Sequence, residues 1–206
     1  MNYEFVELPT DSLEYEILYE AAKAIKDVPG LTCELGVRRG GGSRHIIEGL
    51  MDNSDHGRTH ICVDPYGNID YPEGDDGRVI KCDYTNQMRN DCLKNIYAYI
   101  RHKPIGVLFY VMEDTEFFKR FADGVPIYNE HKQIVNTYAL VHFDGPHTRD
   151  ILYPEIDFFQ ERSVPGSMWV FDDVELYDHD SVEKYVLERG WELVKKGQRK
   201  ASYVKK

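Results

Sequence analysis

Residues 31–43 read LTCELGVRRGGGS, an apolar run that passes directly into a glycine-rich turn. The run predicts a strand over residues 31–37, and the apolar spacing beyond the turn predicts a helix that opens at Ser43. A strand, a tight turn and a helix form the first half of a parallel βα unit. Such a turn lets a nucleoside approach the backbone at the carboxyl end of the strand. A plain strand-to-helix turn with flexible glycines is the alternative interpretation.

The glycine spacing excludes one common cofactor. Glu34-x-Gly36 followed by Gly40-Gly41 does not match G-x-G-x-x-G, the fingerprint of NAD-binding domains. The turn therefore favours a nucleoside cofactor other than NAD.

Strand-like and helix-like stretches alternate from this turn to the end of the chain, which favours a parallel sheet covered on both faces. Further strands are predicted at 60–63, 105–112, 138–143 and 168–171, and helices at 88–100, from 115, from 148 and around 182–186. Residues 66–77 are rich in Gly, Pro and Asp and predict a loop. Residues 191–196 and 201–205 flank Gly197 and predict a terminal antiparallel hairpin.

The N-terminal 30 residues predict a helical lead-in to this sheet. Asp11 can cap its helix, with Glu14 three residues later. Residues that share one helical face, and should point inward, are Leu13, Ile17, Leu18, Ala21 and Ile25. We expect one α/β domain over residues 1–206, a Rossmann-like, doubly wound, mostly parallel seven-stranded sheet that closes with the C-terminal hairpin.

The amino-acid composition limits the kinds of partner that we expect for this protein. The 206 residues are 42% hydrophobic, which suits a single domain with a full core. The net charge of −11 leaves no basic footprint for nucleic acid. Four cysteines form no C-x-x-C pair, and neither a leader nor a membrane-length apolar run is visible. We expect a cytoplasmic protein without membrane partners, and a homodimer only because dimers are the commonest oligomers.

Acidic residues follow two predicted strands near the glycine turn. Asp64 ends the second strand, where a carboxylate can accept the ribose hydroxyls of a nucleoside. An ordinary turn-starting Asp before Pro65 is the alternative. Glu113 and Asp114 end the third strand and lie near an adenine or cap the next helix.

The remaining two strand ends predict a metal and a base. Asp144 follows the strand at 138–143, and Asp172 and Asp173 follow the strand at 168–171. The carboxylate oxygens of these residues suit Mg²⁺ or another hard divalent cation. For Asp172 and Asp173 the alternative is that they are solvated acids that cap the next helix. His147, three residues after Asp144, predicts a general base or simply a helix-start histidine.

These segments, in their order, resemble the metal-dependent, class I S-adenosylmethionine (SAM) O-methyltransferases of the macrocin and mycinamicin group. Four segments carry the resemblance: ELGVRRGG at 34–41 is similar to E-x-G-V-x-R-G-G, VDPYG at 63–67 to D-S-F-x-G, HFDGPH at 142–147 to H-x-D-G-x-H, and FDD at 171–173 to the closing acidic pair. The reversed last strand also agrees with the sheets of class I methyltransferases. Arg38 departs from the aromatic residue often seen at its position in the family.

The resemblance implies methyl transfer from SAM to a hydroxyl of a sugar-like or phenol-like small molecule. Asp144, Asp172 and Asp173 would then bind Mg²⁺, and His147 would be the base. The implied cofactor-binding residues are Glu34, Gly36, Val37, Arg39, Gly40, Gly41, Ser43, Asp64, Tyr66, Glu113 and Asp114. Two alternatives stay open: a metal-dependent hydrolase on a similar sheet, and a SAM-binding module without turnover.

Overall fold

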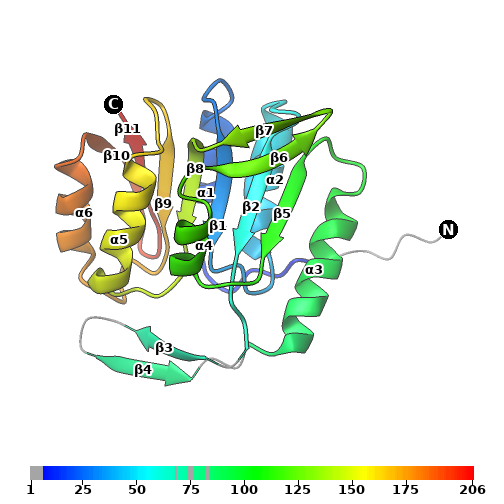
Figure 1. Ribbon diagram of the computed structural model, residues 1–206. Helices are drawn as coiled ribbons and strands as arrows, with labels where there is room; N and C mark the ends of the chain where they lie inside the picture. The colour runs from blue at the N-terminus through cyan, green and yellow to red at the C-terminus, as the bar shows by residue number, and fades with distance from the viewer. Residues whose placement is uncertain (1–6, 68, 74–76, 82–83) are drawn as a thin grey trace.

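A seven-stranded sheet organises the computed structural model, which describes residues 7–67, 69–73, 77–81 and 84–206. The sheet order is β10-β11-β9-β8-β1-β2-β5 (Figure 1). Its strands are β1 (Leu31–Leu35), β2 (Thr59–Val63), β5 (Gly106–Tyr110), β8 (Tyr138–Phe143), β9 (Met168–Phe171), β10 (Trp191–Lys196) and β11 (Ala201–Lys205). Strands β1, β2, β5, β8 and β9 run parallel, and β11 pairs antiparallel with both β9 and β10. The predicted fold class, including the terminal hairpin, is confirmed.

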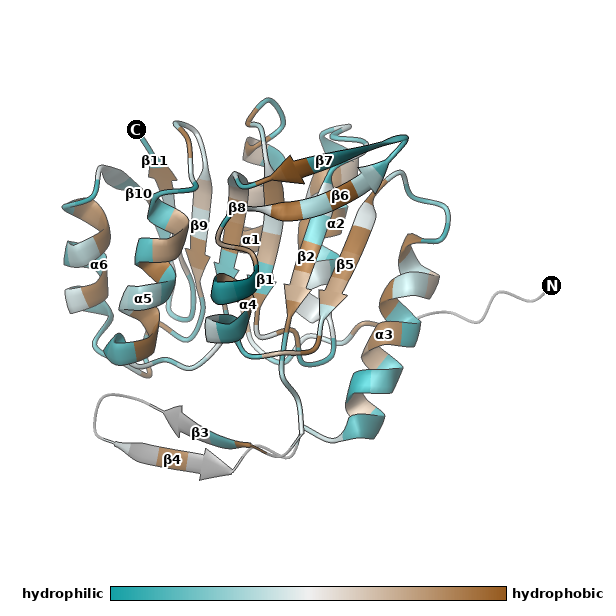
Figure 2. Ribbon diagram, in the orientation of Figure 1, coloured by the Kyte–Doolittle hydropathy of each residue, from teal (hydrophilic) through white to brown (hydrophobic). Residues whose placement is uncertain are grey.

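Helices cover both faces of the sheet. The helices are α1 (Tyr15–Ala24), α2 (Gly41–Asp52), α3 (Asn86–Ile100), α4 (Asp114–Arg120), α5 (Arg149–Gln160) and α6 (His179–Leu187). Helices α4, α5 and α6 lie in front of the sheet in Figure 1, and α1 and α2 lie behind it. Successive strand residues point to opposite faces, so β2, β8 and β9 contribute to two buried clusters, one on each side of the sheet. The strands are accordingly apolar along most of their length (Figure 2).

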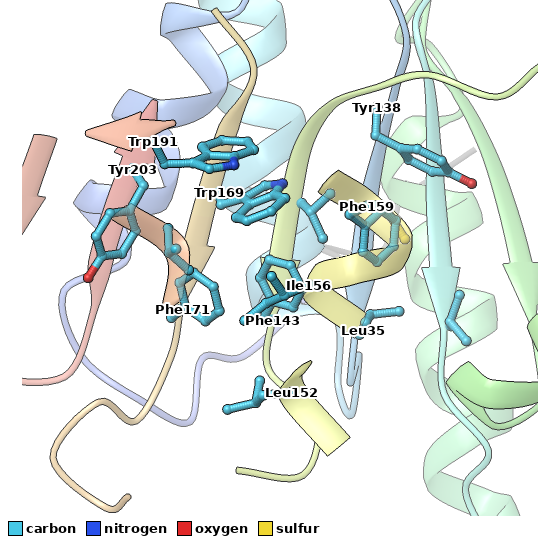
Figure 3. Packing of buried hydrophobic residues seen from close by; sticks show 14 of the residues in the cluster. Leu35, Tyr138, Phe143, Leu152, Ile156, Phe159, Trp169, Phe171, Trp191 and Tyr203 are labelled. Carbon is cyan, nitrogen blue, oxygen red and sulfur yellow. The ribbon is translucent and has the colours of Figure 1, made fainter. Parts of the chain in front are cut away.

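Aromatic side chains lock the reversed hairpin onto the parallel strands. Trp169 on β9 stacks on Trp191 of β10 with ring centroids 3.6 Å apart, and both are buried. Phe171 packs edge-on against Tyr203 of β11, with centroids 5.7 Å apart (Figure 3). Stacked and edge-on aromatic pairs stabilise beyond their buried area. They hold the turn between β10 and β11, residues 197–200, at the end of β9.

Two small hairpins were not predicted. Residues 66–77, expected as loop, contain β3 (Asp70–Glu73), which pairs antiparallel with β4 (Arg78–Lys81). A second hairpin, β6 (Val125–Asn129) with β7 (His131–Val135), follows α4. In Figure 1 the first hairpin lies beyond the carboxyl ends of the parallel strands and the second lies at their opposite ends. Only the β3–β4 hairpin is therefore near the predicted site.

The N-terminal helix begins later than predicted. Helix α1 starts at Tyr15, and Leu13, expected on its inner face, is 65% exposed. Asp11 does not cap this helix, because its carboxylate accepts from the Tyr15 hydroxyl at 2.7 Å and pairs with Arg38. Among the described residues, no helix is long and apolar enough to cross a membrane.

Candidate active site

The glycine turn after β1 packs directly against the backbone at the end of β8. Gly36 adopts a φ of +81°, and a Cβ there would lie 2.0 Å from the Asp144 carbonyl oxygen. The Gly36 N–H donates to Val63 O at 3.0 Å, and the Asp144 N–H donates to Leu35 O at 2.9 Å. Only glycine tolerates both this backbone conformation and this contact. The turn thus joins the carboxyl ends of β1, β2 and β8.

Asp64 shapes the turn from the end of β2. Its Oδ2 accepts from the backbone N–H groups of Val37 at 2.9 Å and Arg38 at 2.8 Å, and its Oδ1 accepts from Tyr66 N–H at 2.9 Å. Burial raises the pKa of Asp64, although these hydrogen bonds oppose the shift. The predicted acidic residue is therefore a turn organiser whose carboxylate also lines the cavity described below.

Glu34 lies beneath the turn in a buried polar cluster. Its carboxylate accepts from the Ser43 hydroxyl and contacts His142 Nδ1 at 3.0 Å. Behind it, His60 contacts Ser43 Oγ at 3.1 Å and Thr32 Oγ1 at 2.9 Å. A Cβ on Gly42 would lie 1.9 Å from Glu34 Oε1, so this glycine makes room for the cluster. Glu34 and Ser43 therefore support the turn from below and do not line the cavity.

A cavity of about 250 Å³ opens beside the turn, at the carboxyl ends of β1, β2 and β8. Gly36, Val63, Pro65 and Ile151 form part of its wall. Its lining is strongly acidic, and the carboxyl groups come from Asp11, Asp64, Asp70, Glu113, Asp114, Asp144 and Glu155. Arg38 is the one basic residue among the described lining. Such a cavity favours a ligand with positive charge and disfavours a dinucleotide pyrophosphate.

Glu155 is a cavity residue that the sequence did not reveal. It lies on α5, is 1% exposed, and neither carboxyl oxygen finds a hydrogen-bond partner in the described part of the chain. Burial and the neighbouring Asp114 raise its pKa well above the ordinary value. A buried carboxyl without a partner is costly, so a ligand that satisfies Glu155 and Asp114 would recover free energy.

Other predicted cofactor residues surround the cavity without lining it. Val37 and Tyr66 are buried, and the Tyr66 hydroxyl donates to Arg38 O at 2.6 Å. Gly40 and Gly41 pack against residues 8–10 of the N-terminal lead-in. Arg39 is exposed and faces a second, shallower hollow. The structure thus brings Gly36, Asp64, Glu113, Asp114 and Asp144 together at one cavity and leaves the others as its support.

Asp144 and Asp172 face each other across the ends of β8 and β9. Burial and the Asp172 charge raise the pKa of Asp144 well above its usual range. Burial opposes ionisation of Asp172 as well, but the Lys200 ammonium and His142 lower its pKa overall. Lys200 Nζ donates to Asp172 Oδ2 at 2.6 Å, and neither side chain is accessible to solvent. Of the two carboxyl groups, Asp172 is therefore the one that its neighbours favour in the charged form.

His147 lies beside Asp173, one residue beyond Pro146 of the cavity wall. Its Nε2 is 3.6 Å from Asp173 Oδ2, and its ring stacks on Tyr177 with centroids 5.3 Å apart. The residue is 7% exposed, and Nδ1 has no hydrogen-bond partner in the described part of the chain. The stack on Tyr177 thus orients the His147 ring next to the Asp173 carboxylate.

The predicted metal ligands do not form an open set of oxygens. Asp172 Oδ1 accepts from the Ser12 hydroxyl at 3.1 Å and from Asp173 N–H at 2.7 Å, while Arg199 lies 2.5 Å from Asp173 Oδ1. Potential donor atoms converge elsewhere among the described residues, in the sets Glu34, His142, Asp144 and Glu34, His60, Cys62. Both sets use the Glu34 carboxylate that Ser43 and His142 already engage. The present contacts therefore do not fit a divalent cation at Asp144, Asp172 and Asp173.

Comparison with known proteins places this geometry in a family. The family model described as "Methyltransferase domain" matches residues 33–174, from the strand before the glycine turn to the residue after Asp173. The chain belongs to this methyltransferase family. No curated protein matches the chain.

Solved structures of methyltransferases share the fold. The O-methyltransferase NovP aligns at 18% identity and a TM-score of 0.64, covering 93% of this chain and 78% of NovP. The O-methyltransferase TomG from Streptomyces achromogenes, solved with SAM, aligns at 11% identity and a TM-score of 0.61, covering 99% and 85%. CalS11, described as a TDP-rhamnose 3′-O-methyltransferase, aligns at 14% identity and a TM-score of 0.50, covering 92% and 76%.

Proposed function

We propose that this methyltransferase transfers a methyl group from SAM to a hydroxyl group of a small molecule. The observation that carries the proposal is the acidic cavity at the glycine turn, since its charge suits a nucleoside that is itself a cation. Bound SAM supplies an electrophilic methyl group on a positively charged sulfur. The methyltransferase family match and the SAM-bound structure of TomG support the choice of cofactor.

The cofactor lies along the carboxyl ends of β1, β2 and β5. In this proposal Gly36 leaves room for the amino-acid part, Asp64 approaches the ribose, and Glu113 and Asp114 lie toward the adenine. The Asp144 and Asp64 carboxyl groups lie on the cavity wall, where their oxygen atoms can stabilise the positive sulfur. These side chains bind and orient; proximity then supplies much of the rate.

His147 is the proposed base for the acceptor hydroxyl. Its Nε2 would take the proton, and Asp173, 3.6 Å away, would stabilise the resulting imidazolium. The stack on Tyr177 holds the imidazole plane fixed. A sugar-like or phenol-like acceptor remains the proposed substrate class, and the sugar enzyme CalS11 among the structural neighbours supports the first of these.

The proposal contains no step through a metal ion. A divalent cation was predicted from the acidic motifs, but the carboxylates of Asp172 and Asp173 are already paired with Lys200 and Arg199. The hydrolase alternative would need a metal to activate water and would leave the cavity at Gly36 without a role. We therefore favour transfer of a methyl group over hydrolysis.

The proposal is tested by incubating the protein with methyl-labelled SAM and a panel of sugar and phenol acceptors. We expect label in at least one acceptor, and a loss of about 10²–10⁴-fold in kcat for His147→Asn. Asp150→Asn, an exposed change three residues away, is the matched control and should keep the wild-type rate. Transfer that is unchanged in His147→Asn would remove this residue as the base.

A further inference from the structure

The turn between β10 and β11 delivers two basic side chains to the acidic pair at the end of β9. Lys200 contacts Asp172 at 2.6 Å, and the ion pair is fully buried. The preceding residue, Arg199, contacts Asp173 at 2.5 Å. Two of the three carboxylates predicted to bind a metal, Asp172 and Asp173, are thus paired with side-chain cations, and both cations come from one turn.

The N-terminal lead-in fixes that turn in place. The Glu14 carboxylate accepts from the backbone N–H groups of Gln198 at 2.9 Å, Arg199 at 2.8 Å and Lys200 at 3.1 Å. A Cβ on Gly197 would lie 2.1 Å from Glu14 Oε2, so glycine permits the close approach. The backbone that carries the two cations is therefore held by a carboxylate from the other end of the chain.

Lys200 is also enclosed by side chains of the lead-in. The Tyr15 ring centroid is 4.0 Å from Nζ, a cation–π contact, and Ser12 donates to the other oxygen of Asp172. The lysine is 0% exposed, so leaving Asp172 would strand an ammonium group without water. A buried cation that loses its partner is strongly disfavoured.

Lys200 and Arg199 together carry the two positive charges that one divalent ion would supply. A metal ion at Asp172 would add like charge beside an ammonium that has no solvent to screen it. Lys200 and Arg199 offset the charges of Asp172 and Asp173, and Arg199 also pairs with Glu175.

We propose that Lys200 and Arg199 replace the divalent cation in this chain, so that the Asp172–Asp173 pair binds no metal. Resting on the proposed function, the corollary is that methyl transfer by this chain does not require a divalent ion. Lys200 and Arg199 act here as positioning residues, because they hold the two carboxylates and do not line the cavity.

The test is a Mn²⁺ titration of chelator-treated full-length protein, followed by electron paramagnetic resonance of the free ion. We expect no wild-type binding that depends on Asp172 below about 1 mM Mn²⁺. The double variant Lys200→Met, Arg199→Gln frees both carboxylates, and we expect at least about tenfold tighter Mn²⁺ binding that Asp172→Asn abolishes. Lys200→Arg keeps the charge and should not gain binding.

The matched control is Lys196→Met on the same hairpin. Lys196 pairs with Asp180 and Glu183 at 3.4 and 3.2 Å on the exposed side, so its loss should leave Mn²⁺ binding as in wild type. Micromolar wild-type binding that Asp172→Asn abolishes would overturn the proposal, as would a folded double variant that gains no binding. If the double variant does not fold, the comparison of Mn²⁺ binding between wild type and Asp172→Asn still tests whether Asp172 binds a metal. The titration uses no SAM, so its outcome is separate from that of the proposed function.

Discussion

Gly36 sits where the chain turns with a φ of +81° directly against the Asp144 carbonyl. Two separate penalties would follow from a side chain there: left-handed backbone for a non-glycine residue, and a contact of 2.0 Å with backbone that cannot rotate away. The glycine turn was predicted from the sequence, but its contact with the end of a strand about 100 residues later was not.

Gly36→Ala is predicted to cost about 1–3 kcal/mol more stability than Gly57→Ala, measured by urea denaturation. Gly57 has a φ of +88°, and a Cβ added there would meet nothing within 4 Å, so its substitution isolates the backbone penalty of about 1 kcal/mol. Equal losses in the two variants would show that the turn can move away from Asp144.

Several site residues show the limit of sequence reasoning at this scale. Asp64, Glu113 and Asp144 follow strands, and parallel strand ends meet at one edge, so their convergence was predictable. Glu155 and Lys200 lie inside a helix and a turn, with no local pattern that separates them from surface residues. Their burial depends on packing between distant segments, which only the structure supplies.

At the scale of elements, the turn at residues 197–200 is held by one carboxylate. Backbone hydrogen bonds, first from Gln198 and also from Arg199 and Lys200, lower the pKa of Glu14 below its ordinary 4.5 despite some burial. A lowered carboxyl pKa stabilises the folded state above the unfolded pKa, and the contribution is lost as the pH falls through the folded value.

Glu14→Gln is predicted to lower the free energy of unfolding by about 1–3 kcal/mol at pH 7, because the charged acceptor of three N–H groups is lost. The difference from wild type should shrink as the pH falls below about 4.5. Glu16→Gln, an exposed change on the same helix, is the control and should alter stability by less than about 0.5 kcal/mol. If the stability difference between wild type and Glu14→Gln does not change with pH, the Glu14 charge does not hold the turn at residues 197–200.

The sheet strands and most helices could be predicted because their apolar residues follow simple periods. Helix α1 begins late because Asp11 is engaged by Tyr15 and Arg38 instead of capping it. The β6–β7 hairpin was missed since most of its residues are exposed and carry no clear alternation. Contacts between distant segments therefore determine both where α1 begins and whether the β6–β7 hairpin forms.

For the whole molecule, two buried histidines contribute to the response to acid. Burial lowers the pKa of His60 to about 3 and that of His179 to about 4. Both are neutral in the folded state, whereas the unfolded chain takes up protons below the ordinary value of 6.5. The contribution of these two histidines to stability is therefore lost as the pH falls below 6.5.

We predict that His60→Gln reduces the slope of stability against pH by about 1.4 kcal/mol per pH unit between pH 6 and about 4.5. Urea denaturation at a series of pH values measures the slope, whatever the variant costs at neutral pH. His56→Gln, an exposed change, should keep the wild-type slope. A wild-type slope in His60→Gln would mean that His60 is not held neutral.

The proposed function depends on SAM binding in the acidic cavity at the glycine turn. Calorimetric titration of the protein with SAM tests it directly, with and without Mg²⁺, on wild type, Asp64→Asn and the exposed control Asp180→Asn. We predict micromolar wild-type binding that Mg²⁺ does not change, weakened at least about tenfold in Asp64→Asn and kept in Asp180→Asn. No binding by wild type under either condition would show that the cavity is not a SAM site.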